Sequence, residues 1–490
     1  MVRRWLSLMA VLLPLCATWA LTNPMFASPD EPAHMARAQG FSRFDFTPPY
    51  ETDGLPMNAP ECYRFIANVT ADCADLAWGV DGTEVETKTR DYPPLFHAVA
   101  AVPVLFVSGL DGAYAMRLWM AFVCCALLAW AGALLIRPGR GPWPVVGFAV
   151  ALTPMSMFVS STVNPSGITL SLSLLVVAGA VARWTYGDGA RNAVVAMAAG
   201  APSLLLVRRD SALWVLVLAV SLMPLALSGS RIRARLRALD PRSWSVRGRV
   251  IGLGVAVAVV ASAVKWIGPI VHRLVTTGEV AGNGSRWQGL GSMRVYLDHM
   301  IGTFGWIDTF IGRTAFSVAA AVCVVVIGLG FASVNRRLVM AEGVSLVALF
   351  ATPVVFGMFI YPYFQGRYML PIWVIVAVMA SLGIASAPSA RLGRPALAAV
   401  LLVVWGGVHV WSLLQNLRRY AVGYRGTWWF TLNAPWAPPT MSNRVAVLMI
   451  VVASAMSAIA LAYVVTQTSS ASRRSSRRKI HQPIESPPTA

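Results

Sequence analysis

Charged residues are scarce in this sequence. Asp, Glu, Lys and Arg make up 12% of its 490 residues, 57% are hydrophobic, and the mean hydropathy is +0.62. A soluble domain carries about 25% charged residues, so this chain lacks the polar surface that would keep it dissolved. The excess apolar surface must face lipid. This composition excludes a soluble enzyme, a disordered chain and a coiled-coil or collagen-like fibre.

Cysteine is scarce too. Six cysteines in 490 residues exclude a disulfide-stapled miniprotein, and no Cys and His spacing matches a metal cage. We therefore expect no metal site. Cys62 and Cys73 lie in a hydrophilic stretch beyond the first apolar run. An oxidising exterior permits a disulfide between them, and two unrelated thiols are the alternative.

Long apolar runs predict the fold class. A helix needs about 20 apolar residues to cross a bilayer, and about twelve such runs indicate an all-α integral membrane protein. We expect the first run to stay as an uncleaved helix, with a cleaved signal peptide as the alternative. The predicted spans are Trp5–Leu21, Ala113–Ile136, Trp143–Ser160, Gly167–Ala182, Asn192–Val207, Ala212–Ser228, Val250–Gly268, Ala315–Val334, Ala341–Ile360, Tyr368–Ser386, Pro395–Leu414 and Val445–Val465.

The basic residues predict the orientation. Lys and Arg total 40 against 21 Asp and Glu, a net charge of +19. With the N-terminus in the cytoplasm, every short inner loop holds at least two basic residues, as the positive-inside rule requires. The charge therefore indicates membrane topology, and we expect no nucleic-acid partner. The outer turn Arg208-Arg209-Asp210 is an exception, so a re-entrant hairpin over 192–228 is an alternative to two spans. An even number of spans puts both termini in the cytoplasm.

The acidic residues show where the extramembrane mass lies. Thirteen of the 21 Asp and Glu fall between Asp30 and Asp111, in the longest non-membrane stretch. No Walker loop or Gly-rich dinucleotide motif is present, so no nucleotide site is expected. The predicted organisation is a polytopic domain over 1–466, a first extracytoplasmic loop with interfacial helices over 23–112, further extracytoplasmic segments over 269–314 and 415–444, and a disordered basic cytoplasmic tail over 467–490.

Two adjacent carboxylates follow the first predicted helix. Asp30 and Glu31 would lie at the membrane surface, with His34 and Arg37 next at helical spacing. A carboxylate held at lipid headgroup level can act as a general base. The alternative is an acidic N-cap that faces the dipole of the following helix. The predicted spans themselves are nearly free of ionisable residues, which weakens a transporter reading because coupled transport usually needs a charge near the midplane.

Four short motifs, in consistent order, carry a resemblance to a known family. They are Pro29-Asp-Glu-Pro-Ala-His34, Asn164-Pro165, Phe304-Gly-Trp-Ile-Asp308 and Gln365-Gly-Arg-Tyr-Met-Leu-Pro371. This pattern resembles a bacterial family of polytopic membrane proteins of unknown function with an N-terminal PDEP-x-H motif. That family is in turn similar to the GT-C-fold glycosyltransferases that use polyprenyl-phosphate-linked sugars. Every motif falls on the outer side of the topology drawn from charge.

The resemblance implies a GT-C-like fold and sugar transfer on the extracytoplasmic face of the bacterial plasma membrane. The donor would be a polyprenyl-phosphate-linked sugar and the acceptor an envelope glycan or lipid. Asp30 is then the first choice for catalytic base and Glu31 the second, and Arg367 is the best candidate to bind the leaving phosphate. An interfacial anchor is the alternative for Arg367, and a helix cap is favoured for Asp308. The further substrate-binding candidates are His34, Arg37, Arg117, Tyr368, Arg418 and Arg419.

Other functions stay open at this stage. A flippase or transporter of a lipid-linked saccharide would suit about twelve spans, and a non-catalytic scaffold in cell-wall assembly would make the carboxylates structural. No cofactor is required beyond the lipid-linked donor. A divalent metal on the paired carboxylates is conceivable, but two adjacent acids do not argue for one. The oligomeric state cannot be read from the sequence.

Overall fold

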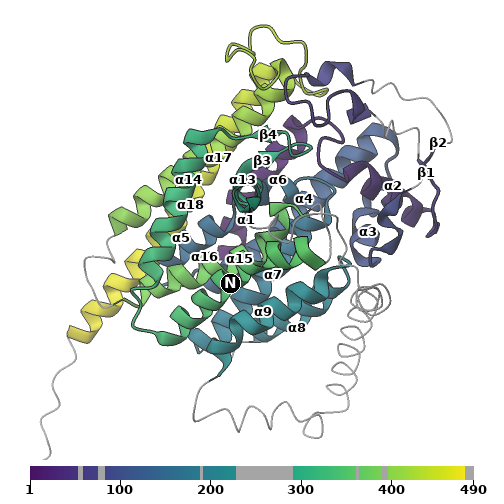
Figure 1. The fold of residues 1–490 in the computed structure, drawn as a ribbon. Helices are drawn as coiled ribbons and strands as arrows, with labels where there is room; N and C mark the ends of the chain where they lie inside the picture. Colours follow the sequence, from purple (N-terminus) through teal and green to yellow (C-terminus); the bar gives the residue numbers. More distant parts are fainter. Residues whose placement is uncertain are drawn as a thin grey trace, which may run out of the picture.

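The computed structural model describes the chain apart from residues 53–58, 75–82, 86, 188–190, 228–290, 360–363, 388–394 and 481–490. Its described part is almost entirely helical, with two short antiparallel hairpins, β1 (Tyr50–Thr52) with β2 (Thr83–Val85) and β3 (Thr303–Phe304) with β4 (Thr309–Phe310). Figure 1 shows a bundle of long helices with a lobe of short elements beside its upper end. The predicted span Val250–Gly268 lies outside the described residues.

Within the described residues, eight helices are long and apolar enough to cross a membrane, and a bent helix pair makes a ninth candidate. The prediction of an all-α protein with many membrane helices is confirmed. The expected number of about twelve is not, because α8 and α9 have 15 and 16 residues and a straight span needs about 17 or more. The helices of the bundle are α1 (Val2–Thr22), α4 (Gly109–Leu135), α5 (Trp143–Ala151), α6 (Pro154–Ser160), α7 (Pro165–Ala180) with a π turn to Thr185, α8 (Arg191–Leu205), α9 (Ser211–Ala226), α14 (Arg313–Gly330), α15 (Arg336–Phe359), α16 (Leu370–Ala385), α17 (Pro395–Val422) and α18 (Asn443–Ile480).

The centre of the bundle is formed by α7 and α16. In the 18-residue apolar stretch of each candidate span, all residues of the α7 span and 89% of those of the α16 span are buried inside the protein. The corresponding shares are 28% for α14 and 22% for α18. On the outer helices the exposed side chains are apolar, and Val324, Val403 and Ile459 are each more than two-thirds exposed. Such a surface is stable against lipid and not against water. The protein is therefore a multi-pass membrane protein.

The predicted third span is broken in the middle. α5 and α6 are bent by 61° at a short break, where Pro154 cannot continue the preceding helix. Thr153 starts α6 with a capping box, since its hydroxyl accepts from the Ser156 amide while the Ser156 hydroxyl accepts from the Thr153 amide. The same Thr153 hydroxyl donates to the Met300 carbonyl at the end of α13 (Met293–Gly302). The break thus ties the bundle to the segment before α14.

The first loop folds into the lobe of short elements. It contains α2 (Glu31–Ser42), the β1–β2 hairpin, the 3-10 turns η1 (Ala59–Cys62), η2 (Ala71–Cys73), η3 (Lys88–Asp91) and η4 (Pro103–Leu105), and α3 (Leu95–Ala100). Cys62 and Cys73 form a disulfide that joins η1 to η2, as the sequence led us to expect. Of the interfacial helices expected in this loop, the apolar stretch over 95–107 forms α3 and η4, which begins at Pro103, and Leu105 and Phe106 are exposed.

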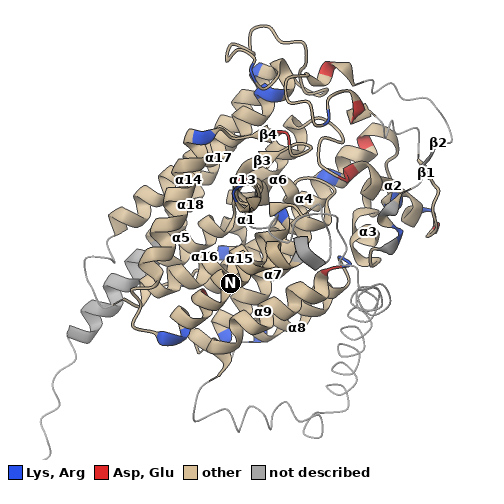
Figure 2. Cartoon of the chain, in the orientation of Figure 1, with Lys and Arg blue, Asp and Glu red and all other residues tan. Residues whose placement is uncertain are grey.

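Acidic residues are concentrated at one side of the molecule. Figure 2 shows most Asp and Glu in and beside the lobe of the first loop, whereas Lys and Arg are found both there and at the opposite end of the helices. At the other end of the chain, α18 continues to Ile480 and so enters the segment 467–490 that we expected to be disordered. That stretch contains neither Gly nor Pro before Pro483, so nothing in it stops the helix.

Candidate functional site

Glu31 forms a buried ion pair with Arg117. Its carboxylate is completely buried and receives two hydrogen bonds from Arg117, Nε to Oε1 at 2.8 Å and Nη2 to Oε2 at 2.6 Å. The Val163 amide donates a third to Oε1 at 3.0 Å. Arg117 also donates to the carbonyls of Ala20, Asn23 and Pro24. This cluster joins the end of α1, the start of α2, α4 and the turn before α7, and it leaves Glu31 no free access to a substrate.

Asp30, one residue earlier, faces the other way. Its side chain is 54% exposed, and its Oδ2 accepts from Nη2 of Arg367 at 2.8 Å. Arg367 comes from the 3-10 turn η7 (Gly366–Met369) before α16 and is 95% buried. Its Nε and Nη1 have no hydrogen-bond partner among the described residues. The structure therefore brings the first-choice base and the first-choice phosphate ligand into direct contact.

Asp30 itself has a left-handed backbone conformation, and its carboxylate and that of Glu31 have different partners. Asp30 has φ 65° and ψ 0° and precedes α2 without a hydrogen bond from its side chain to the helix. The N-cap alternative therefore does not hold for the Asp30 carboxylate, which points to Arg367 instead. The turn is fixed from outside, because the Asn164 amide donates to the Pro29 carbonyl at 2.9 Å. A non-glycine residue in this conformation costs about 1 kcal/mol or more, and such strain clusters at functional sites.

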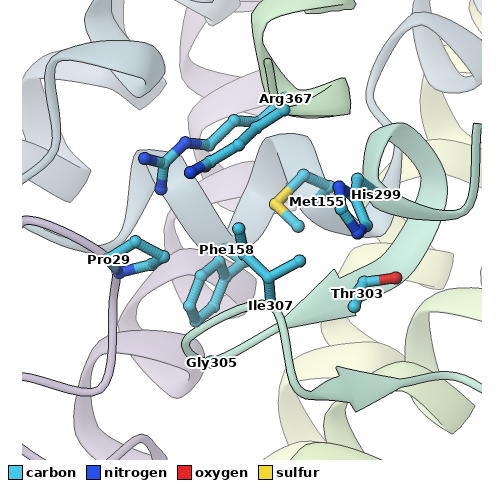
Figure 3. A pocket seen from close by; sticks show the side chains of 9 residues that line it. Pro29, Met155, Phe158, His299, Thr303, Gly305, Ile307 and Arg367 are labelled. Carbon is cyan, nitrogen blue, oxygen red and sulfur yellow. The ribbon is translucent and has the colours of Figure 1, made fainter. Parts of the chain in front are cut away.

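A small cavity lies next to this pair. Its lining comes from the turn before α2, from α6, from the segment between α13 and β4, and from η7 (Figure 3). Five buried polar atoms of the lining have no hydrogen-bond partner in the described part of the chain: His299 Nδ1, Thr303 Oγ1, Gln365 Oε1 and two nitrogens of Arg367. Burial, with the nearby charge of Arg367, lowers the pKa of His299 to about 4, so His299 is neutral. Buried polar groups are normally satisfied, so unpartnered atoms on several residues that line one cavity mark it as a candidate binding site.

The backbone around the cavity is unusually constrained. Ile307 lines the cavity with φ 64°, and a β-branched residue there is a true outlier. A Cβ on Gly366 would lie 1.8 Å from the Tyr296 carbonyl oxygen, so only glycine lets η7 approach α13 this closely. Trp306 donates its indole N–H to the Phe26 carbonyl at 3.0 Å and ties this segment to the end of α1. The Phe304–Asp308 and Gln365–Pro371 motifs thus build one wall together.

Asp308 and Arg419 form a second buried ion pair. Arg419 Nη2 lies 2.9 Å from Asp308 Oδ2, and neither side chain is more than 5% exposed. Arg419 also donates to the carbonyls of Tyr63, Ile66 and Val69 in the first loop. The helix-cap interpretation of Asp308 is wrong, because its carboxylate orients Arg419 and lies before no helix. Arg419 clamps the loop to α17.

Arg418 is engaged in a similar way. It donates to the side chain of Gln415 and to the carbonyls of Tyr424 and Gly426, and it stacks over Trp428 at 4.2 Å. Arg418 and Arg419 donate their hydrogen bonds to other residues of this chain. This geometry favours structural roles for both, in contrast to Arg367.

His34 and Arg37 lie on the lobe side of α2. His34 Nδ1 is 3.1 Å from His97 Nε2, and both rings are buried. Burial is the main cause that lowers the pKa of His34 to about 3, and Arg208, Arg367 and Arg37 lower it further against the opposing effect of Asp30. Arg37 donates to the carbonyls of Thr89 and Tyr92. The imidazole is therefore a neutral packing partner and not a cation for phosphate.

The sequence analysis missed Arg208 as a site residue. Arg208 is buried, pairs with Asp210 at 2.7 Å and donates to the Ser166 hydroxyl at 3.0 Å. Its guanidinium carbon lies 4.6 Å from the centre of the Tyr368 ring, and that of Arg367 lies 5.4 Å from the same ring. Tyr368 therefore contacts two arginines. The signal was present in the sequence, since Arg208 belongs to the outer turn that broke the positive-inside rule.

Two further observations concern ionisable groups. Glu342 in α15 is fully buried, and neither carboxylate oxygen has a partner among the described residues. It lies against Gly330, where a Cβ would come within 2.7 Å of both oxygens. In the part of the chain that the structure describes, no group of three or more His, Cys, Asp or Glu could hold a metal ion.

The chain matches one protein-family model and is similar to two crystal structures. The family model described as "Predicted membrane protein (DUF2142)" matches residues 13–376. No curated protein matches the chain. Two crystal structures of ArnT from Cupriavidus metallidurans are similar to it. The one bound to undecaprenyl phosphate is 15% identical, with a TM-score of 0.44 over 96% of this chain and 78% of ArnT. The apo structure is 12% identical, with a TM-score of 0.42 over 94% and 77%.

Proposed function

The chain belongs to the DUF2142 family of predicted membrane proteins, and we propose that it is a membrane glycosyltransferase. It moves a sugar from a polyprenyl-phosphate carrier to an envelope glycan or lipid acceptor on the extracytoplasmic face of the plasma membrane. The observation that carries the proposal is the pair of Asp30 and Arg367: a half-exposed carboxylate held by a buried guanidinium that keeps two nitrogens free of partners in the described chain.

The chemistry follows from the two side chains. Asp30 takes the proton from an acceptor hydroxyl, whose oxygen then attacks the anomeric carbon of the donor sugar. The bond between that carbon and the phosphate oxygen breaks, and its electron pair stays on the polyprenyl phosphate. Arg367 neutralises the charge that develops there, since its Nε and Nη1, which have no partner among the described residues, can each donate to a phosphate oxygen. The products are the glycosylated acceptor, the carrier phosphate and protonated Asp30.

The position of the pair suits a lipid-linked donor. Asp30 follows the end of α1, and Arg367 precedes α16, so both lie where membrane helices begin or end. A polyprenyl tail cannot leave the bilayer, and its phosphate must therefore react at this level. Glu31, the second choice for the base, instead supports the site by fixing the start of α2 through Arg117.

The test uses a deletion strain complemented at equal membrane levels. We expect an envelope glycan component to be lost on deletion, restored by the wild type, and not restored by Asp30→Asn. Asp72→Asn, in an exposed carboxylate of the same loop, is the matched control and should restore it. Loss of a positioned base lowers transfer by about 100-fold or more.

Arg367→Lys separates phosphate binding from folding. Lysine keeps the charge but loses the planar fork, so transfer should fall while the protein remains inserted and monodisperse in detergent. Full complementation by both Asp30→Asn and Arg367→Lys would sink the proposal and leave transport or a scaffold role. Cysteine labelling from both sides of the membrane then separates those two, because only a transporter exposes its pathway to the cytoplasm.

A further inference from the structure

We propose that the cavity beside Asp30 and Arg367 is a hydroxyl-recognition subsite, so that the donor sugar carries a neutral hydroxyl at the position that enters it. An ammonium, carboxylate or acetamido group at that position is rejected. This inference rests on the proposed function and names the class of sugar that the same site takes.

The polar atoms of the cavity match a hydroxyl group. A hydroxyl offers one donor and two acceptor lone pairs. His299 Nδ1 and the Thr303 hydroxyl can each take either role, Gln365 Oε1 can only accept, and the Arg367 nitrogens can only donate. The residues that line the cavity thus carry both a donor and an acceptor for a hydroxyl group.

The size of the cavity favours a small group. Its volume is about 10 Å³, which is close to the space that a single water molecule occupies. A hydroxyl is of that size, while an acetamido group or a carboxylate adds two or more heavy atoms. Met155, Phe158 and Ile307 form the apolar part of the wall, and Met155 and Phe158 are buried in tight packing that cannot yield without strain.

The charges of the cavity exclude a cation. No carboxylate lines it among the described residues, and the neighbouring Asp30 is already paired with Arg367. His299 is neutral because burial and Arg367 lower its pKa to about 4. An ammonium group would therefore meet a fixed positive charge with no compensating anion, whereas a hydroxyl meets none of this penalty.

The experiment measures sugar transfer in proteoliposomes with synthetic polyprenyl-phosphate donors. The panel carries a neutral hexose or pentose and the corresponding amino, acetamido and uronic acid sugars. We expect the wild type to use a neutral donor with a kcat/KM about 100-fold or more above the other three, because a buried site that pairs a hydroxyl discriminates strongly. Thr303→Val should lower transfer of the neutral donor about tenfold, since it removes a hydrogen-bond partner and keeps the shape.

Met155→Ala provides a gain of function. It enlarges the cavity and should raise transfer of the acetamido donor about tenfold relative to that of the neutral donor. Met120→Ala is the matched control, because Met120 is a buried methionine of α4 that does not line the cavity, and it should leave the selectivity unchanged.

The outcomes are separable. If the wild type transfers no donor of the panel, the proposed function fails. If it transfers sugar but uses the amino, acetamido or uronic acid donor as well as the neutral one, the function stands and the inference is overturned. The inference is also overturned if Thr303→Val and Met155→Ala leave the selectivity unchanged, since the cavity then holds only a structural water.

Discussion

Glu31→Gln should unfold the start of the first loop and not remove the catalytic base. The substitution keeps the length of the side chain but removes the charge that balances Arg117. Both side chains are completely buried, and their contacts are 2.6 and 2.8 Å long. Arg117 would be left as a buried cation with only neutral carbonyls around it.

The magnitude follows from burial. Removing one partner of a buried ion pair costs about 3–5 kcal/mol, because the other charge stays buried without compensation. The same change at Asp30 removes a contact between a carboxylate that is 54% exposed and the buried Arg367, so its cost should lie between that of an exposed pair, about 1 kcal/mol or less, and that of the Glu31 change. The carboxylate of Glu31 should therefore contribute more to stability than that of Asp30.

The assay is thermal unfolding of the purified protein in detergent, followed by the monodisperse fraction on size exclusion. Glu31→Gln should lower the midpoint clearly, and Asp30→Asn should leave it close to the wild type while abolishing transfer. Glu61→Gln is the matched control, since Glu61 pairs with Arg64 on the surface and both are 40% or more exposed. Its midpoint should match the wild type.

Either of two results would contradict these assignments of Glu31 and Asp30. If Glu31→Gln were as stable as the wild type yet inactive, the buried carboxylate would have a chemical role that the ion pair hides. If Asp30→Asn lost stability as strongly as Glu31→Gln, its contact with Arg367 would be structural.

Three further predictions concern the first loop. Burial lowers the pKa of His34 to about 3 from the usual 6.5, so between these pH values the unfolded chain binds more protons than the folded protein. The free energy of unfolding should therefore fall as the pH drops below about 6.5, by up to about 1.4 kcal/mol per pH unit. His34→Phe should reduce this pH dependence in melting curves. Asp308→Asn should cost about 3 kcal/mol because Arg419 loses its buried partner, measured as a lower unfolding midpoint. Replacing Cys62 and Cys73 with serine should cost about 2–3 kcal/mol, measured as faster limited proteolysis of the loop without loss of membrane insertion.

The fold class was predictable because its signal is local. An apolar run long enough to cross a bilayer is a property of consecutive residues, and α1, α4 and α14 lie within a few residues of the spans expected for them. The count of spans was harder, because the runs that include α8 and α9 form helices of only 15 and 16 residues. Composition does not say where a helix stops.

The candidate residues were predictable as a set but not in their roles. The motifs that carry Asp30, Asp308 and Arg367 all meet near one cavity, as their common place on the outer face suggested. The sequence offered no way to tell Arg367, with free nitrogens, from Arg419, whose donors are taken by the first loop. Which cation is free depends on contacts between segments hundreds of residues apart.

The residues that were missed share a physical reason. His299, Thr303 and Gln365 are ordinary polar residues with no distinctive spacing, and they become notable only because their unpartnered atoms face one cavity. Glu342 escaped notice because a single acid in an apolar run does not disturb the hydropathy of the span. Burial without a partner is visible only in three dimensions.

The division of labour between Asp30 and Glu31 depends on one backbone angle. In a regular helix, successive side chains point about 100° apart. Two adjacent carboxylates would then lie on neighbouring faces of one helix. The positive φ at Asp30 breaks that geometry, so that Glu31 begins α2 facing Arg117 while Asp30 stays outside the helix and meets Arg367. Pro32 in the first turn and the Asn164 contact to the Pro29 carbonyl hold this turn from both sides. The strain is thus stabilised by its surroundings, and the buried ion pair helps to keep the exposed carboxylate in contact with Arg367.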